Sequence, residues 1–229
     1  MLFIENPYLK EFESQVQKIE NDSIILEQTA FYAKSGGQPG DVGKITLNEK
    51  EINIIDTVYD HEKNILHVCE NSNDLKVGEN IKGEVNWEIR YKHMRMHSAL
   101  HLLCSLIPYD VTGGQISFEK SRLDFNAEDK IEKEEIENKI NQLVKDDHEI
   151  SYQWITNEEL DKQPELVRTM SVKPPRTNNK IRLVKISNID LQPCGGTHVK
   201  STNEIGEIKI GKIENKGKMN RRVNLLIND

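Results

Sequence analysis

The sequence has few of the features that mark secreted or membrane proteins. No apolar run in its 229 residues is long enough to span a bilayer, and the first residues lack the basic start and long apolar stretch of a signal peptide. Its three cysteines, Cys69, Cys104 and Cys194, are an odd number without the spacing of a disulfide framework. No internal repeat or low-complexity tract is visible. We therefore expect a cytoplasmic protein of one or two domains, with no membrane partner.

Basic residues are outnumbered by acidic ones, and the formal net charge is −7. This balance argues against a general nucleic-acid binder, and we expect no DNA partner. The basic residues are nevertheless clustered, because residues 166–189 contain six of them and no acid. Such clusters attract phosphates even in an acidic protein, although they are also typical of solvated surfaces. The clusters comprise Arg90, Lys92 and Arg95; Arg168, Lys173, Arg176, Lys180, Arg182 and Lys185; and Lys216, Lys218, Arg221 and Arg222.

The first candidate ligand pair is His97-Ser-Ala-Leu-His101. Apolar residues around it recur at helical spacing, which predicts a helix over 91–106 that ends before Pro108. Residues four apart share one helix face, so both imidazoles can bind one metal ion. Zinc proteases use the same pair, but Ser98 stands where their glutamate would be, which argues against that activity.

The second candidate pair is Cys194-Gly-Gly-Thr-His198, a tight loop preceded by a proline. With His97 and His101 it offers three imidazoles and one thiolate, a set that suits tetrahedral Zn²⁺. Each pair alone is also typical of ordinary histidines and cysteines. The residues leave open whether such a zinc ion is structural or catalytic.

Two regions differ in pattern. Residues 1–86 contain short alternating runs separated by turns, which predicts a small β-barrel with residues 76–85 as its closing strand. Residues 87–229 mix helical and strand patterns, including a helix over 129–147 and strands over 149–155, 181–189 and 204–227. We predict an α+β fold class, with a barrel domain over 1–86 and an α+β domain over 87–229 whose helices pack on an antiparallel sheet.

The segment from Gln28 to Gly43 is rich in glycine but lacks the Lys-Ser or Lys-Thr of a phosphate-binding loop. Exposed backbone at Gly36 and Gly37 could approach a nucleotide or an esterified amino acid, and Thr29 and Gln38 could supply hydrogen bonds there. A plain turn between strands explains the same residues.

Taken in order, residues 31–43, His97-Ser-Ala-Leu-His-Leu-Leu103 and Cys194-Gly-Gly-Thr-His-Val199 strongly resemble the editing domain of alanyl-tRNA synthetase. Residues 122–125 and 217–222 extend the likeness over nearly the whole chain. The chain is therefore similar to the free-standing alanyl-tRNA editing proteins of the AlaX family, of the medium-length type with a β-barrel before the editing core.

This resemblance implies hydrolysis of tRNA(Ala) mischarged with serine, and of glycine-charged tRNA(Ala) as a second substrate. It implies Zn²⁺ as the cofactor, held by His97, His101, Cys194 and His198. It places Thr29, Gln38, Gly36 and Gly37 near the amino-acid pocket. We further predict that tRNA phosphates contact Arg168, Arg176, Arg182, Arg221 and Arg222. A tRNA-binding module with a structural zinc, and a zinc hydrolase of another small ester, stay open as alternatives, as does the choice between a monomer and a weak homodimer.

Overall fold

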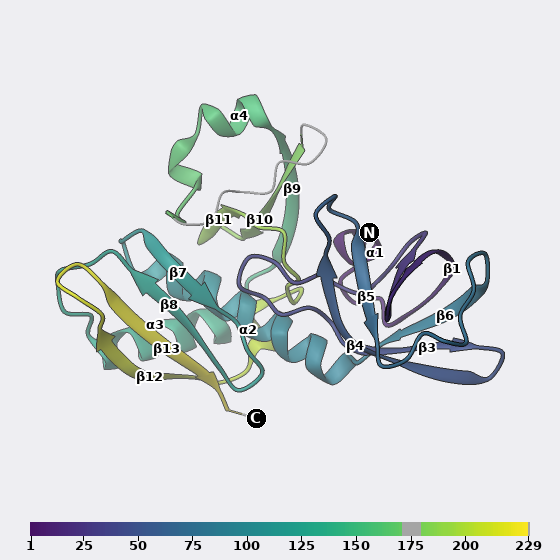
Figure 1. Ribbon diagram of the computed structural model, residues 1–229. Helices are drawn as coiled ribbons and strands as arrows, with labels where there is room; N and C mark the ends of the chain where they lie inside the picture. Colours follow the sequence, from purple (N-terminus) through teal and green to yellow (C-terminus); the bar gives the residue numbers. More distant parts are fainter. Residues whose placement is uncertain (171–179, 229) are drawn as a thin grey trace. The chain divides into compact units, whose positions relative to one another are not determined.

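A computed structural model describes residues 1–170 and 180–228 (Figure 1). The chain forms two compact units, Met1–Lys92 and His93–Asp229, which are described separately here. The predicted boundary at residue 86 precedes this division by six residues. The division falls within one helix. Arg90, in the first turns of that helix, bonds to residues of the first unit, so these turns belong to that unit.

The first unit is a closed six-stranded antiparallel barrel with the strand order β1-β2-β5-β4-β3-β6. β6 pairs with both β1 and β3, so it is the predicted closing strand. A short helix, α1 (Leu2–Glu5), precedes the barrel. The strands are β1 (Glu11–Glu20), β2 (Ser23–Leu26), β3 (Gly43–Leu47), β4 (Lys50–Tyr59), β5 (Ile65–Cys69) and β6 (Asn80–Val85).

Alternating side chains fill the barrel. Along β1, Phe12, Ser14 and Val16 point inward and their neighbours are exposed. The ring of Phe12 lies against Gly83 of β6, where a Cβ atom would come within 2.4 Å of it. Each fully buried aliphatic or aromatic side chain of this core contributes about 1.5–3 kcal/mol relative to an exposed one. Closure removes the free strand edges, so the barrel needs no covering element.

The second unit combines helices with two antiparallel sheets. One sheet has the order β12-β13-β8-β7 and the other β11-β10-β9. The predicted α+β class is confirmed, but the strands form two sheets instead of one. The elements are α2 (Trp87–Leu106), β7 (Val111–Gln115), β8 (Lys120–Phe125), α3 (Lys133–Lys145), β9 (Ile150–Thr156), α4 (Asn157–Asp161), η1 (Pro164–Leu166), β10 (Lys180–Ile186), β11 (Asp190–Pro193), η2 (Thr202–Ile205), β12 (Ile208–Asn215) and β13 (Arg221–Ile227).

The helices follow the predicted patterns but begin at different residues. α2 begins at Trp87, because the side chain of Asn86 accepts the backbone N–H of Ile89 and caps the helix. In α3, which lies within the predicted helix over 129–147, an apolar stripe is buried at Ile136, Ile140 and Val144. No helix within residues 1–170 and 180–228 combines the length and apolar character needed to cross a membrane.

Candidate metal centre

The four predicted ligands come together in the second unit. His97 and His101 lie one turn apart on α2, and Cys194 and His198 lie in the loop after β11. Their donor atoms all lie within 4.8 Å of one another. The Sγ atom of Cys194 is 3.4 Å from Nε2 of His97 and 3.4 Å from Nε2 of His198. Ordinary Zn–N and Zn–S bond lengths imply ligand separations of about 3.3–3.6 Å in a tetrahedron, so these two sulfur–nitrogen separations fit zinc.

Two polar side chains orient these imidazoles. The Nδ1 atom of His101 is 2.8 Å from a carboxylate oxygen of Asp190, which leaves Nε2 for a metal ion. The Nδ1 atom of His198 is 3.3 Å from the hydroxyl of Ser98, which also accepts the N–H of Val199. Such partners fix the ring tautomer and orientation in metal sites. Sequence reasoning missed Asp190, although its place at the start of the strand leading to Cys194 was an available signal.

Two members of the cluster, Cys194 and His198, favour charge states that suit a cation. Burial alone would raise the pKa of the Cys194 thiol, but His97 and His198 outweigh it and hold the pKa well below the usual range. Burial, reinforced by His97, lowers the pKa of His198 well below its usual value. Burial would also lower the pKa of His101, but the hydrogen bonds and negative charges of Asp190 and Cys194 together outweigh it and raise the pKa to about 10. Asp190 therefore stabilises positive charge at that ring, whether a proton or a metal ion brings it.

Arg182 of β10 fixes the ligand loop. Its backbone carbonyl accepts the N–H of Cys194, at 3.1 Å. Its side chain donates from Nε to the carbonyl of Cys194, at 3.0 Å, and from Nη2 to the carbonyl of Gly196. The guanidinium also lies 4.6 Å from the ring centre of Tyr152. This buried arginine thus holds the backbone on both sides of Gly195.

The glycine-rich segment belongs to the first unit. Ser35 and Gln38 exchange backbone hydrogen bonds around a two-residue turn. Gly36 and Gly37 both have positive φ, 54° and 83°, the conformation that hairpin turns of this length demand. The glycines therefore close a tight turn, which is the simpler of the two interpretations of this segment given by the sequence.

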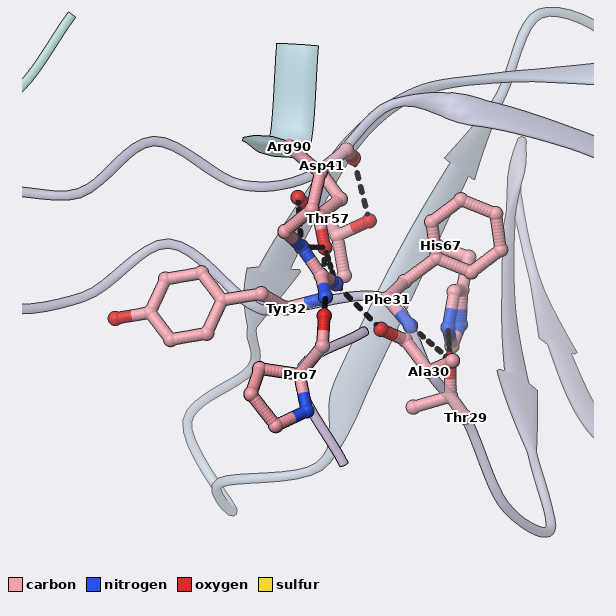
Figure 2. A network of polar contacts seen from close by, with 9 residues as sticks. All are labelled: Pro7, Thr29, Ala30, Phe31, Tyr32, Asp41, Thr57, His67 and Arg90. Atoms are coloured by element: carbon pink, nitrogen blue, oxygen red, sulfur yellow. Dashed lines mark hydrogen bonds and ion pairs between the residues drawn. The ribbon is translucent and has the colours of Figure 1, made fainter. Parts of the chain in front are cut away.

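Thr29 is only 4% exposed, and its hydroxyl makes hydrogen bonds with His67 and Phe31 (Figure 2). The Nδ1 atom of His67 donates to the carbonyl of Ile24, because a carbonyl can only accept. Burial lowers the pKa of His67 to about 4, so its Nε2 atom is unprotonated and accepts from the hydroxyl of Thr29, at 2.8 Å. That hydroxyl also accepts the N–H of Phe31. Among residues 1–170 and 180–228, one lone pair of this hydroxyl has no donor.

A buried ion pair anchors the same segment (Figure 2). Arg90 of α2 binds both carboxylate oxygens of Asp41, and the two side chains are 0% and 1% exposed. The remaining donors of the arginine reach the carbonyls of Pro7 and Ala30. The grouping of Arg90 with surface basic residues was therefore wrong, since its charge is neutralised inside the first unit. Sequence alone could not pair two residues 49 positions apart.

Besides Arg182, three of the five arginines predicted to contact tRNA have protein partners. Arg168 donates to the carbonyls of Ile107 and Tyr109, each at 2.9 Å. Arg222 binds both carboxylate oxygens of Asp124. Arg221 donates to the carbonyls of Gly217, Lys218, Asn220 and Glu128. Arg176 lies outside the described residues, and contact of any of these arginines with tRNA stays a prediction.

Comparison with known proteins identifies both units. Residues 3–89 match the family model of class II (A) tRNA synthetases, and residues 181–224 match that of the threonyl and alanyl tRNA synthetase second additional domain. The chain is 36% identical to alanyl-tRNA editing protein AlaX-M of Methanosarcina acetivorans, over 97% of this chain and 96% of that protein. It is 38% identical to AlaX-M of Saccharolobus solfataricus, with the same coverage. It is 35% identical to alanine–tRNA ligase of Pyrococcus abyssi, over 93% of this chain but 24% of that protein.

Proposed function

The chain belongs to the AlaX-M family of alanyl-tRNA editing proteins, and from this premise we propose that it is a trans-editing hydrolase that deacylates mischarged tRNA(Ala). The principal substrate is seryl-tRNA(Ala), and glycyl-tRNA(Ala) is the second. The observation that carries the proposal is the convergence of three imidazoles and one thiolate, with donor separations that fit a zinc ion.

Nε2 atoms of the imidazoles and the Cys194 thiolate would hold the zinc ion. When bound, zinc supplies Lewis acidity, which can polarise a carbonyl or lower the pKa of a water molecule. The residues around it keep the donors ready. Asp190 retains the proton on Nδ1 of His101, Ser98 orients His198, and Arg182 holds the loop that carries the thiolate. The reaction moves the acyl group from a ribose hydroxyl to water. Because the ester linkage already activates the carbonyl group, the site has only to bind the ester.

Such an enzyme is needed because a binding pocket for alanine discriminates poorly against glycine and serine. A pocket built for alanine cannot strongly reject glycine, and it rejects an added hydroxyl by only about 10²-fold. A second site that binds the serine hydroxyl can recognise what the first admits. We assign this recognition to Thr29 and Gln38, in the segment closed by Gly36 and Gly37. Because the hydroxyl of Thr29 already donates to His67, it would act toward serine as an acceptor.

The same proposal includes electrostatic contacts with tRNA phosphates by Arg168, Arg176, Arg182, Arg221 and Arg222. Each phosphate contact that is lost should weaken tRNA binding and reduce the slope of its salt dependence by about one counterion. Unchanged slopes for all five variants would contradict this assignment.

The decisive experiment is a deacylation assay with seryl-, glycyl- and alanyl-tRNA(Ala), run together with metal analysis of the purified protein. We expect fast hydrolysis of the seryl ester, slower hydrolysis of the glycyl ester and none of the alanyl ester. Cys194→Ala should lose both bound zinc and activity. Cys69→Ala is the matched control, since Cys69 is buried in the barrel and is not part of the cluster. Full activity in metal-free, folded protein would contradict a requirement for zinc.

A second candidate function is a tRNA-binding module with a structural zinc. The observation in its favour is that all four candidate ligands are protein side chains, the usual arrangement of a structural site. Such a protein would bind zinc and tRNA(Ala) but hydrolyse none of the three esters. Hydrolysis of small esters without any dependence on tRNA would instead indicate a general zinc hydrolase.

A further inference from the structure

The sheet β11-β10-β9 has two distinct faces. Leu160 of α4 packs on one face against Ile181 and Leu183, and together they form a small apolar core. The other face carries the side chains that alternate with these along the strands. On β10 they include Arg182 and Val184, and the register pairs them directly with Trp154 and Tyr152 of β9.

This second face belongs to the metal centre. At one end of it, Asp190 bonds to His101 of the ligand cluster. Further along, Arg182 donates to the carbonyls of Cys194 and Gly196 and lies over the ring of Tyr152. Directly opposed residues of antiparallel strands have Cβ atoms about 4.5–5.5 Å apart. Trp154 is therefore the neighbour of the residue that fixes the ligand loop.

Trp154 differs from the other tryptophan. Trp87 stacks on Tyr91, with ring centres 5.3 Å apart, and lies under the ammonium group of Lys10. Trp154 is 50% exposed and has no aromatic or cationic partner over its ring within residues 1–170 and 180–228. A half-exposed indole beside a metal site has a large apolar area for a flat ligand.

A second observation concerns the neighbouring arginine. The Nη1 atom of Arg182 is buried, yet it has no hydrogen-bond partner among the described residues. The side chain is otherwise 5% exposed and fully engaged through Nε and Nη2. A buried donor without an acceptor is unfavourable, so the position favours a ligand that brings an oxygen atom.

We propose that Trp154 is the stacking platform for the unpaired terminal base of the RNA substrate, and that the same nucleotide supplies an oxygen atom to Nη1 of Arg182. The inference rests on the proposed function and deepens it. Single-stranded RNA ends are recognised by stacking of bases on aromatic side chains and by contacts of arginine with their oxygens. In an aminoacyl-tRNA the terminal ribose carries the ester. A base held at Trp154 therefore places its own ribose on the side of Arg182 and the ligand loop.

The test measures binding of uncharged tRNA(Ala), so it does not depend on hydrolysis. Trp154→Ala should weaken binding about 5- to 100-fold, as expected for the loss of one stacked base, and Trp154→Phe should retain most of the affinity. Ile55→Ala is the control, since it removes another exposed apolar side chain, outside the predicted tRNA contacts, and should have no effect. Zinc content should equal that of the wild type in all three variants.

A truncated RNA sharpens the experiment. tRNA(Ala) lacking its terminal adenosine should bind the wild type as weakly as intact tRNA binds Trp154→Ala, and the two losses should not add. Intact tRNA should quench the tryptophan fluorescence of the wild type, and Trp154→Phe should abolish this quenching because Trp87 is the only other tryptophan. Equal affinity of Trp154→Ala and wild type, or additive losses, would overturn the proposal.

Arg182→Lys separates the two roles of the arginine. Zinc content reports on the loop, and tRNA affinity at full zinc occupancy reports on the Nη1 contact. Loss of affinity for intact tRNA, without loss for truncated tRNA, would support the contact, and equal losses for both would contradict it. If the wild type binds and is quenched as expected but hydrolyses no ester, the proposed function fails while the stacking site stands.

Discussion

Two buried polar clusters, one in each unit, differ in whether their charges and hydrogen-bonding groups are balanced within the protein. In the first unit, the Arg90 guanidinium meets the Asp41 carboxylate and two backbone carbonyls, so opposite charges and donors balance within the protein. In the second unit, three imidazoles and one thiolate direct their donor atoms toward one another. The arrangement in the first unit holds the backbone at Pro7 and Ala30 in place. The second arrangement brings together lone pairs that a bound cation would stabilise.

The difference explains what each cluster contributes. A balanced ion pair inside a low-dielectric barrel is costly to break, because either partner alone is an uncompensated charge. It therefore ties the glycine-rich segment to the first turns of α2. A convergent donor set gains its stability from a ligand, and its free energy depends on metal concentration.

The largest expected effect tests the balanced cluster. Arg90→Leu should destabilise the protein by about 3–5 kcal/mol in denaturant unfolding, because Asp41 is left buried without its counter-charge. Lys139→Ala is the control, since the pair of Lys139 with Glu135 is exposed and such pairs contribute only about 0.3–0.5 kcal/mol. The double variant Arg90→Leu/Asp41→Asn should recover part of the loss. Equal destabilisation by the two single arginine and lysine variants would contradict the comparison.

The next effect concerns the neutral histidine of the barrel. Burial lowers the pKa of His67 from 6.5 to about 4, so between these values the unfolded chain binds a proton that the folded chain excludes. Stability should therefore be retained above pH 6.5 and fall as the pH drops toward 4, by about 3 kcal/mol in total. His67→Gln should remove this pH-dependent part of the unfolding free energy. His61→Gln, at an exposed position of the same unit, should keep it, and identical pH slopes for both variants would refute the assignment.

A smaller effect tests the convergent cluster. Asp190→Asn should weaken zinc binding by about 10- to 100-fold in competition with a chromogenic chelator, because His101 loses its anionic partner. Asp146→Asn is the matched control: its carboxylate also approaches a histidine, His148 at 3.9 Å, but at an exposed site away from the ligands. Unchanged zinc affinity in Asp190→Asn would show that the carboxylate does not support the metal.

The smallest effect concerns the turn that the balanced cluster anchors. Gly37→Ala should destabilise the protein by about 1–2 kcal/mol, since φ is 83° there and a Cβ atom disfavours that conformation. Gly37→Asn should cost less, because asparagine tolerates positive φ. Thermal unfolding of the two variants measures the difference. Equal losses would indicate that the glycine is needed for space, not for backbone conformation.

Local patterns predicted much of the fold. Alternation indicated the barrel strands and the closing strand, because most inward side chains of so small a core are apolar. The apolar stripe of α3 indicated its buried face. The arrangement of the second unit in two sheets was not predictable in this way, since periodicity reports which face of a strand is buried but not which strand lies beside it.

By itself, the sequence determined the ligand chemistry of the candidate metal centre. Two histidines four apart on a helix, together with a Cys–His pair flanking two glycines, indicated a set of four ligands that suits zinc. Only the tertiary structure decided which charged side chains are neutralised by a partner and which are left to contact a ligand. It buried Arg90 against Asp41, placed Arg182 on the ligand loop beside an exposed Trp154, and gave His101 its carboxylate. The physical reason is that the environment of a charge depends on residues distant in sequence, which local patterns do not encode.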